Sequence, residues 1–190
     1  MRDRLPNLAR EAEPASASRK FLREVVAALL GALALAAAAK WQVPFYPVPM
    51  TLQTFVVLVL GAFFGARLAS ATVGLYLAEG FFGLPVFAGW AAGPETLSGP
   101  TGGYLFGFLA TAALVGFLAD RGVTRSLIGL IVAMGLGHVV ISALGFGWLA
   151  AELGPVKAWA IGVAPFYGSM LLKTALAVAL TRALAPRRGG

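Results

Sequence analysis

The sequence has no cysteine, one histidine and few charged side chains. Only 12% of its 190 residues are Asp, Glu, Lys or Arg, which is about half the share in a typical soluble domain. Without cysteine, disulfides, thiolate metal sites and cysteine nucleophiles are excluded. A single histidine makes a histidine-based metal site unfavourable. We therefore expect no metal site and no cofactor in this chain.

Apolar residues are what the sequence has in excess. They make up 59% of the chain before its 24 glycines are counted, whereas soluble domains reach about 45–50% with glycine included. A soluble domain of this composition would lack the polar side chains to cover its surface. We predict an all-α membrane protein, in which the net charge of +7 reports orientation in the lipid rather than binding to nucleic acid.

The apolar runs and the breaks between them predict six transmembrane helices. A helix needs about 20 residues to cross the hydrocarbon core, so six helices leave no room for a soluble catalytic domain. The predicted helices cover about 21–41, 51–66, 68–82, 101–121, 126–151 and 158–184. Together they form a membrane domain over 21–186. Residues 1–20 are basic and lack apolar periodicity, and we predict that they form a disordered cytoplasmic tail.

Lys and Arg are distributed unevenly between the two sides of the predicted bundle. Twelve fall on the side of the N-terminal tail, and two, Lys40 and Lys157, fall on the other side. Basic residues favour the cytoplasmic side, which places both termini in the cytoplasm and the protein in the cytoplasmic (inner) membrane as a multi-pass protein. The outer loops are then 42–50, 83–100 and 152–157. Two of them are rich in proline, glycine and aromatic residues, which is typical of irregular backbone that lines a cavity.

Lys173 lies deep within the last predicted helix. An ammonium at this depth is costly and usually faces the interior of the bundle or a wet cavity. We interpret it as the counter-ion of an anionic substrate. The alternatives are snorkelling to the outer headgroups or pairing with Glu79 or Glu95.

Further polar candidates lie near the outer ends of the predicted helices. Gly102 and Gly103 open the fourth helix, where their N–H groups favour a carboxylate or phosphate, although close helix packing explains them equally well. Thr51 and Gln53 suit either helix capping and loop contacts or recognition of a urea or amide. His138 lies in the middle of the fifth predicted helix, and for it we favour a packing role over a proton relay.

Aromatic and small residues give two further patterns. Several aromatic side chains fall near the outer face, where they form an interfacial belt or line a pocket for an apolar ring: Phe45, Tyr46, Trp90, Tyr104 and Tyr167. Small residues of the first helix, including Ala28, Ala32 and Ala36, form a stripe that lets another helix approach closely. That helix belongs either to this chain or to a partner subunit.

Three segments carry a resemblance to a known family. They are VPMTLQT at 48–54, GLPVFAG at 83–89 and GPTGGY at 99–104. Over about 21–184 the chain resembles the BioY family, the biotin-binding S components of energy-coupling-factor (ECF) transporters. The resemblance implies the six-helix S-component fold and an outer-side pocket for biotin. It also implies a transmembrane coupling subunit and two ATPase subunits that hydrolyse ATP, with a homo-oligomer as a further possibility and membrane lipid around the bundle.

The last predicted helix departs from the family pattern at one position. Pro165, Phe166 and Lys173 match, but Met170 stands where the family has an Asp that is associated with substrate binding. A thioether cannot accept a ureido N–H hydrogen bond as a carboxylate does. The departure keeps another vitamin open as the ligand.

The resemblance and the residues together predict one substrate site. Lys173 and the N–H groups of Gly102 and Gly103 would neutralise the biotin carboxylate or bind another polar group, while aromatic rings pack on the bicycle and 83–100 acts as the lid. The predicted substrate-binding residues are Lys173, Thr51, Gln53, Trp90, Thr101, Gly102, Gly103, Tyr104, Tyr167 and Phe45. An intramembrane enzyme is a weaker alternative, because the sequence lacks paired catalytic groups, and we expect no enzymatic activity.

Overall fold

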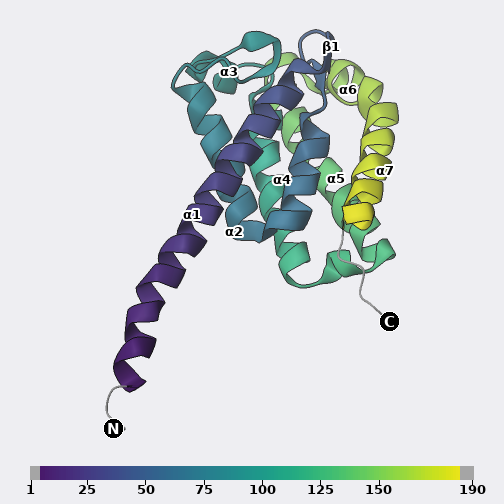
Figure 1. The fold of residues 1–190 in the computed structure, drawn as a ribbon. Coiled ribbons are helices and arrows are strands. Elements are labelled where there is room, and N and C mark those ends of the chain that lie inside the picture. Colours follow the sequence, from purple (N-terminus) through teal and green to yellow (C-terminus); the bar gives the residue numbers. More distant parts are fainter. Residues whose placement is uncertain (1–4, 185–190) are drawn as a thin grey trace.

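The computed structural model describes residues 5–184, and these are mostly helical (Figure 1). The long helices are α1 (Leu5–Lys40), α2 (Gln53–Phe81), α4 (Gly102–Asp120), α5 (Leu127–Leu153) and α7 (Tyr167–Leu184). The short elements are α3 (Pro94–Ser98), α6 (Pro155–Gly162) and the 3₁₀ turns η1 (Ala88–Trp90), η2 (Val123–Arg125) and η3 (Ala164–Phe166). Strands β1 (Gln42–Val43) and β2 (Met50–Thr51) pair antiparallel.

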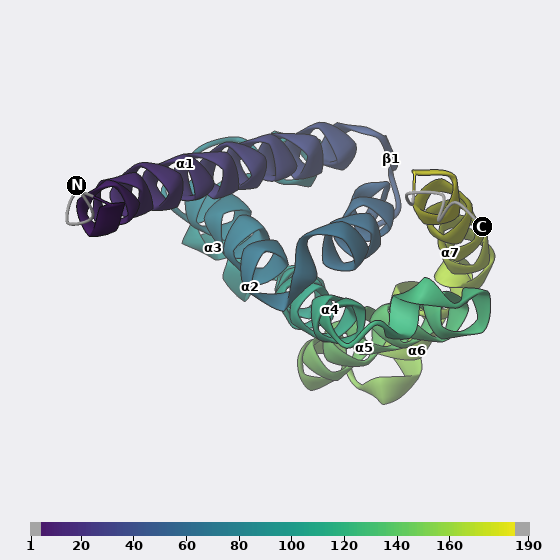
Figure 2. The same cartoon turned by 60° about the horizontal axis from the view of Figure 1, so that its bottom comes forward.

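Apolar helices dominate the described part of the chain. Within residues 5–184, five segments are long and apolar enough to cross a membrane: Ala17–Lys40, Gln53–Phe81, Gly102–Asp120, Leu127–Leu153 and Pro155–Leu184. The prediction of a helical protein with several apolar spans is confirmed. The helices α1 and α7 lie at opposite edges of the bundle, with α2, α4 and α5 between them (Figure 2).

Helix α2 folds back on itself at Gly65. This glycine has φ 73° and ψ 173°, a backbone conformation that side chains with a Cβ rarely adopt. Gln53 Nε2 lies 2.6 Å from Tyr76 OH although the two residues are 23 positions apart, a distance that a straight helix would stretch to about 34 Å. Asp120 accepts the N–H of Ala66 at 2.9 Å and so caps the second arm. The predicted helices over 51–66 and 68–82 place this turn at Arg67, two residues too late.

The beginning of α1 differs from the predicted disordered tail over 1–20. Residues 5–20 continue the helix, and their side of α1 projects beyond the rest of the bundle (Figure 1). Ala, Leu, Glu and Arg between positions 8 and 13 are strong helix formers, which a composition argument based on charge overlooks. Residues 1–4, like 185–186 at the end of the predicted membrane domain, lie outside the described residues.

The small-residue stripe of α1 packs inside the chain. Ala32 is fully buried in the core cluster that includes Ala69 and Val73 of α2. A Cβ on Gly31 would lie 2.5 Å from Thr72 Cγ2, so the two helices approach closely here. For Ala32, the structure shows packing against α2 of this chain rather than an interface with a partner subunit. Ala28 and Ala36 are only partly buried and remain predictions for that interface.

The irregular segments gather at one end of the bundle, which we call the loop-rich end. It carries the β1–β2 hairpin, residues 82–101 with α3, and α6 (Figure 1). The last apolar segment is broken there: α6 and α7 are separate helices joined by η3, whereas the sequence predicts one helix over 158–184. Pro165 lies within η3 and has no N–H to continue a helical hydrogen-bond ladder.

Candidate ligand-binding site

Two adjoining cavities lie beneath the loop-rich end. The larger has a volume of about 220 Å³ and the smaller about 60 Å³. They share five lining residues, which makes them two parts of one site: Val48, Pro49, Thr51, Tyr104 and Phe108.

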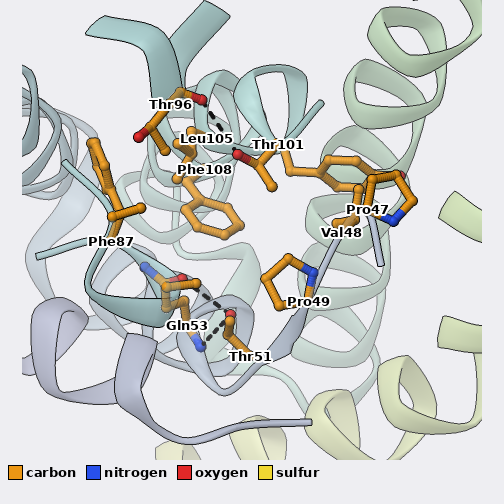
Figure 3. Close-up of a pocket in the computed structure, with 13 residues that line it drawn as sticks. Pro47, Val48, Pro49, Thr51, Gln53, Phe87, Thr96, Thr101, Leu105 and Phe108 are labelled. Atoms are coloured by element: carbon orange, nitrogen blue, oxygen red, sulfur yellow. Dashed lines mark hydrogen bonds between the residues drawn. The ribbon is translucent and has the colours of Figure 1, made fainter. Parts of the chain in front are cut away.

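The larger cavity has mostly apolar walls (Figure 3). The proline-rich segment before β2 supplies Pro47, Val48 and Pro49, and the rings of Phe87 and Phe108 enter from residues 83–100 and from α4. Proline fixes φ, so this segment, which bends over residues 46–48, is constrained without a hydrogen-bonded ladder. Apolar walls with a few placed polar groups are typical of sites for small organic ligands.

A hydrogen-bonded chain holds the floor of the larger cavity. Thr51 Oγ1 lies 3.1 Å from Gln53 Oε1, and Gln53 Nε2 donates to Tyr76 OH at 2.6 Å. The Tyr76 hydroxyl then donates to the carbonyl of Val86 at 3.3 Å. Thr51 and Gln53 therefore face the cavity and also tie α2 to the segment that covers it.

Residues 83–100 cover the larger cavity and are fastened to α1 and α2. Lys40 Nζ donates to the carbonyls of Pro85 at 2.7 Å and Phe87 at 2.9 Å. The Phe87 ring is 1% exposed and packs edge-on against Tyr76, with ring centroids 5.5 Å apart. Gly80 leaves the space that this ring fills, because a Cβ there would overlap it. The predicted lid segment thus forms one wall of the site.

Lys173 joins α7 to β2 beside the smaller cavity. Its Nζ donates to the carbonyl of Thr51 at 2.6 Å, across 122 residues of sequence. The side chain is 9% exposed, so it does not snorkel, and the structure gives it no carboxylate partner within residues 17–184. An ammonium has three N–H donors, and burying one without an anion is costly. The remaining donors are available to a ligand.

Several polar side chains line the smaller cavity. Besides Lys173, it is lined by Thr54, His138, Ser142 and Met170. His138 Nδ1 lies 2.8 Å from the hydroxyl oxygen of Thr174. His138 Nε2 and Thr54 Oγ1 are buried, and neither has a hydrogen-bond partner in the described part of the chain.

Half of the predicted substrate-binding residues line these cavities. The structure brings together Lys173, Thr51, Gln53, Thr101 and Tyr104. Of the other aromatic candidates, Trp90 is 69% exposed and covers Lys40 Nζ at 4.1 Å. Phe45 packs against Phe166, and Tyr167 packs against Trp159. These three rings are outside the set of residues described as lining either cavity.

Gly102 and Gly103 allow close packing at the start of α4. The N–H of Gly102 donates to the carbonyl of Gly99 at 2.9 Å. A Cβ on Gly102 would overlap the Leu97 carbonyl, and one on Gly103 would overlap Trp148. The start of α4 is therefore covered by α3 and α5, which the sequence alone does not reveal.

Several lining residues were missed by the sequence reasoning. Phe108 follows Tyr104 by four residues, so it lies on the same face of α4, and this spacing is a signal that could have found it. Phe87 lies within the quoted GLPVFAG segment. Thr54 likewise lies within the quoted VPMTLQT segment. His138 carries no such signal, because its place in the wall depends on how α5 packs against α7.

The comparisons with known proteins agree with this geometry. The model of the BioY family matches residues 9–189. The chain belongs to the BioY family. Two BioY relatives are a probable biotin transporter BioY of Pyrococcus horikoshii, 37% identical over 77% of this chain and 86% of that protein, and a biotin transporter BioY of Thermotoga maritima, 34% identical over 82% and 92%.

A solved structure extends the likeness to the fold. It is the crystal structure at 2.1 Å of the S-component for biotin from an ECF-type ABC transporter, with a TM-score of 0.78 and 26% sequence identity. The match covers 90% of this BioY chain and 95% of that chain. The family that the three sequence segments predict is confirmed.

Proposed function

We propose that this BioY-family chain captures biotin with high affinity and supports its uptake as the substrate-binding S component of an ECF-type transporter. The observation that carries the proposal is the two-part cavity, located in a chain that resembles a solved biotin S-component over 90% of its length. Biotin combines an apolar bicycle with a ureido group and a carboxylate. The apolar walls around Phe87 and Phe108 suit the bicycle, and Lys173 suits either polar end.

The orientation of the chain follows from this role. We propose six passes, with both arms of α2 crossing the cytoplasmic membrane and both termini in the cytoplasm. The fold-back at Gly65 supports this count, and so do the start of α1 and the end of α7, which lie toward the same end of the bundle (Figure 1). The loop-rich end then faces outward, and a ligand enters from there.

The absence of cysteine makes the orientation directly testable. Ser98→Cys places a thiol at the loop-rich end, and Thr124→Cys places one in η2 at the opposite end. In intact cells, an impermeant maleimide should label only the first variant, and both after permeabilisation. Labelling of the second variant alone in intact cells would overturn the orientation.

The partners remain part of the proposal. A transmembrane coupling subunit and two ATPase subunits would supply the ATP hydrolysis, while this chain holds no cofactor and performs no catalysis. Ala28 and Ala36, with the exposed apolar face of α1 around Leu29, Leu30 and Leu33, are the surface we assign to a coupling subunit. Lipid, or a second copy of the chain, would otherwise cover that face.

A ligand panel tests the function. Purified chain in detergent is titrated calorimetrically with biotin, riboflavin and thiamine, and we expect saturable binding of biotin alone at nanomolar concentration. Met170 gives the second candidate a specific basis, because a thioether stands near Lys173 where the family has a carboxylate. Binding of another vitamin in place of biotin would identify an S component of different specificity, and binding of none by monodisperse protein would reject both.

A further inference from the structure

The smaller cavity contains polar groups that the protein itself leaves unsatisfied. His138 is 3% exposed, and its Nε2 has no hydrogen-bond partner among the described residues, nor does the buried Oγ1 of Thr54. Leaving such groups unpaired costs about 1–3 kcal/mol each. Since both residues line the same cavity as Lys173, a bound ligand is the natural partner for these atoms.

We propose that His138 and Thr54 form, with Lys173, a recognition site for the ureido group of the ligand. This inference rests on the proposed biotin-binding function and assigns which end of the ligand enters the smaller cavity. Biotin would place its ureido ring among these three side chains and extend its carboxylate-bearing chain along the larger cavity.

The hydrogen-bonding capacity of the three groups favours a ureido group over a carboxylate. Lys173 only donates, so it can bind either the ureido oxygen or a carboxylate oxygen, and the choice between the two ends depends on His138. The Thr174 hydroxyl lies 2.8 Å from His138 Nδ1. If Nδ1–H donates to the hydroxyl, Nε2 is an acceptor. If the hydroxyl donates to Nδ1, Nε2 carries the proton and is a donor. A ureido group offers both N–H donors and a carbonyl acceptor, so it satisfies either form, whereas a carboxylate satisfies only the donor form.

Met170 explains why His138 takes this part here. Its sulfur accepts a weak hydrogen bond from the Ser142 hydroxyl at 3.6 Å, and a thioether is a poor acceptor for a ureido N–H. Its neighbour in the wall, His138, comes from α5 rather than α7. In the tautomer whose Nδ1–H donates to Thr174, the imidazole Nε2 supplies the acceptor that the side chain at position 170 does not.

Two substitutions of His138 test the proposal by calorimetric titration with biotin. His138→Phe keeps a ring of similar size but removes Nε2, and we expect biotin affinity to fall about ten- to hundredfold. His138→Gln places an amide near the position of Nε2, and we expect it to recover most of that loss. Unliganded thermal unfolding of each variant separates a binding defect from a folding defect, because His138 also packs in the wall.

A second pair of variants provides a matched control. Thr54→Val and Thr181→Val each remove a buried hydroxyl that lacks a partner in the described chain, but Thr181 lies near the far end of α7 and away from both cavities. We expect Thr54→Val to weaken biotin binding several-fold and Thr181→Val to leave it unchanged. Equal effects of the two variants on affinity would remove Thr54 from the site.

Titration with biotin and with biotinamide shows which end of biotin lies at His138. Biotin and biotinamide share the ureido ring, but only biotin carries the carboxylate. We expect His138→Phe to weaken both by the same factor. A loss confined to biotin would place the carboxylate at His138 and overturn the assignment. If wild-type chain binds biotin while His138→Phe binds it equally well, only this inference fails; if wild-type chain binds no biotin, the proposed function fails first.

Discussion

Replacing Lys173 with methionine removes the ammonium while keeping a long unbranched side chain. In the structure, this ammonium donates one N–H to the Thr51 carbonyl at 2.6 Å. Lys173 also lines the smaller cavity, where its remaining N–H donors are available to a ligand. A hydrogen bond from a charged donor contributes about 1.5–3 kcal/mol. We therefore expect the Kd for biotin to rise roughly 10- to 150-fold.

The stability of the unliganded variant should change less than its affinity. The substitution leaves the Thr51 carbonyl without its donor, which is unfavourable, but it also removes a buried charge that has no carboxylate partner within residues 17–184. These effects oppose each other. Thermal unfolding in detergent, followed by circular dichroism, measures the balance.

Calorimetric titration with biotin is the assay, and Lys157→Met is the matched control. Lys157 is an exposed lysine at the same end of the bundle, so its replacement removes an equal charge without touching either cavity. If Lys173→Met bound biotin within twofold of the wild type, the ammonium would have no part in recognition, and our account of the smaller cavity would be refuted.

Three further changes probe the cover and the frame of the site. Lys40→Met removes both bonds to residues 83–100, so biotin should dissociate faster in a chase with unlabelled ligand; an unchanged rate would show that the cover is held by other contacts. Gly65→Ala forces a Cβ into positive φ and against Asp120, and should lower the free energy of unfolding by about 1–2 kcal/mol, measured by denaturant titration; no loss would contradict the tight fold-back. Tyr104→Phe removes the hydroxyl that donates to the carbonyl of Gly162, at the end of α6, at 2.7 Å. It should lower the free energy of unfolding by about 1 kcal/mol in the same titration, and a gain in stability would argue against that bond.

Much of the fold was predictable because lipid imposes simple demands on a sequence. Apolar runs of sufficient length gave the helical spans, and proline marked the irregular connections. The turn in α2 was placed at Arg67 because a charge is conspicuous in an apolar run. The actual turn at Gly65 depends on positive φ and on a cap from Asp120, which lies far away in the sequence.

The sequence predicts a site residue only where the residue type is unusual for its surroundings. A buried lysine stands out in any apolar helix, and Lys173 does line a cavity. Gly102 and Gly103 have the composition of an anion site, but tertiary packing closes the helix start with α3 and Trp148. From the sequence, His138 was interpreted as a packing residue. Only the arrangement of α5 against α7 shows that it lines the smaller cavity with an Nε2 that has no hydrogen-bond partner among the described residues.

The single bond between Lys173 and Thr51 has a mechanical consequence. It links α7 to strand β2, whose Thr51 lines both cavities. A shift of α7 along its axis would therefore strain this bond, break it, or move β2 as well. A displacement of α7 would therefore act first on the backbone of Thr51, at the boundary that the two cavities share.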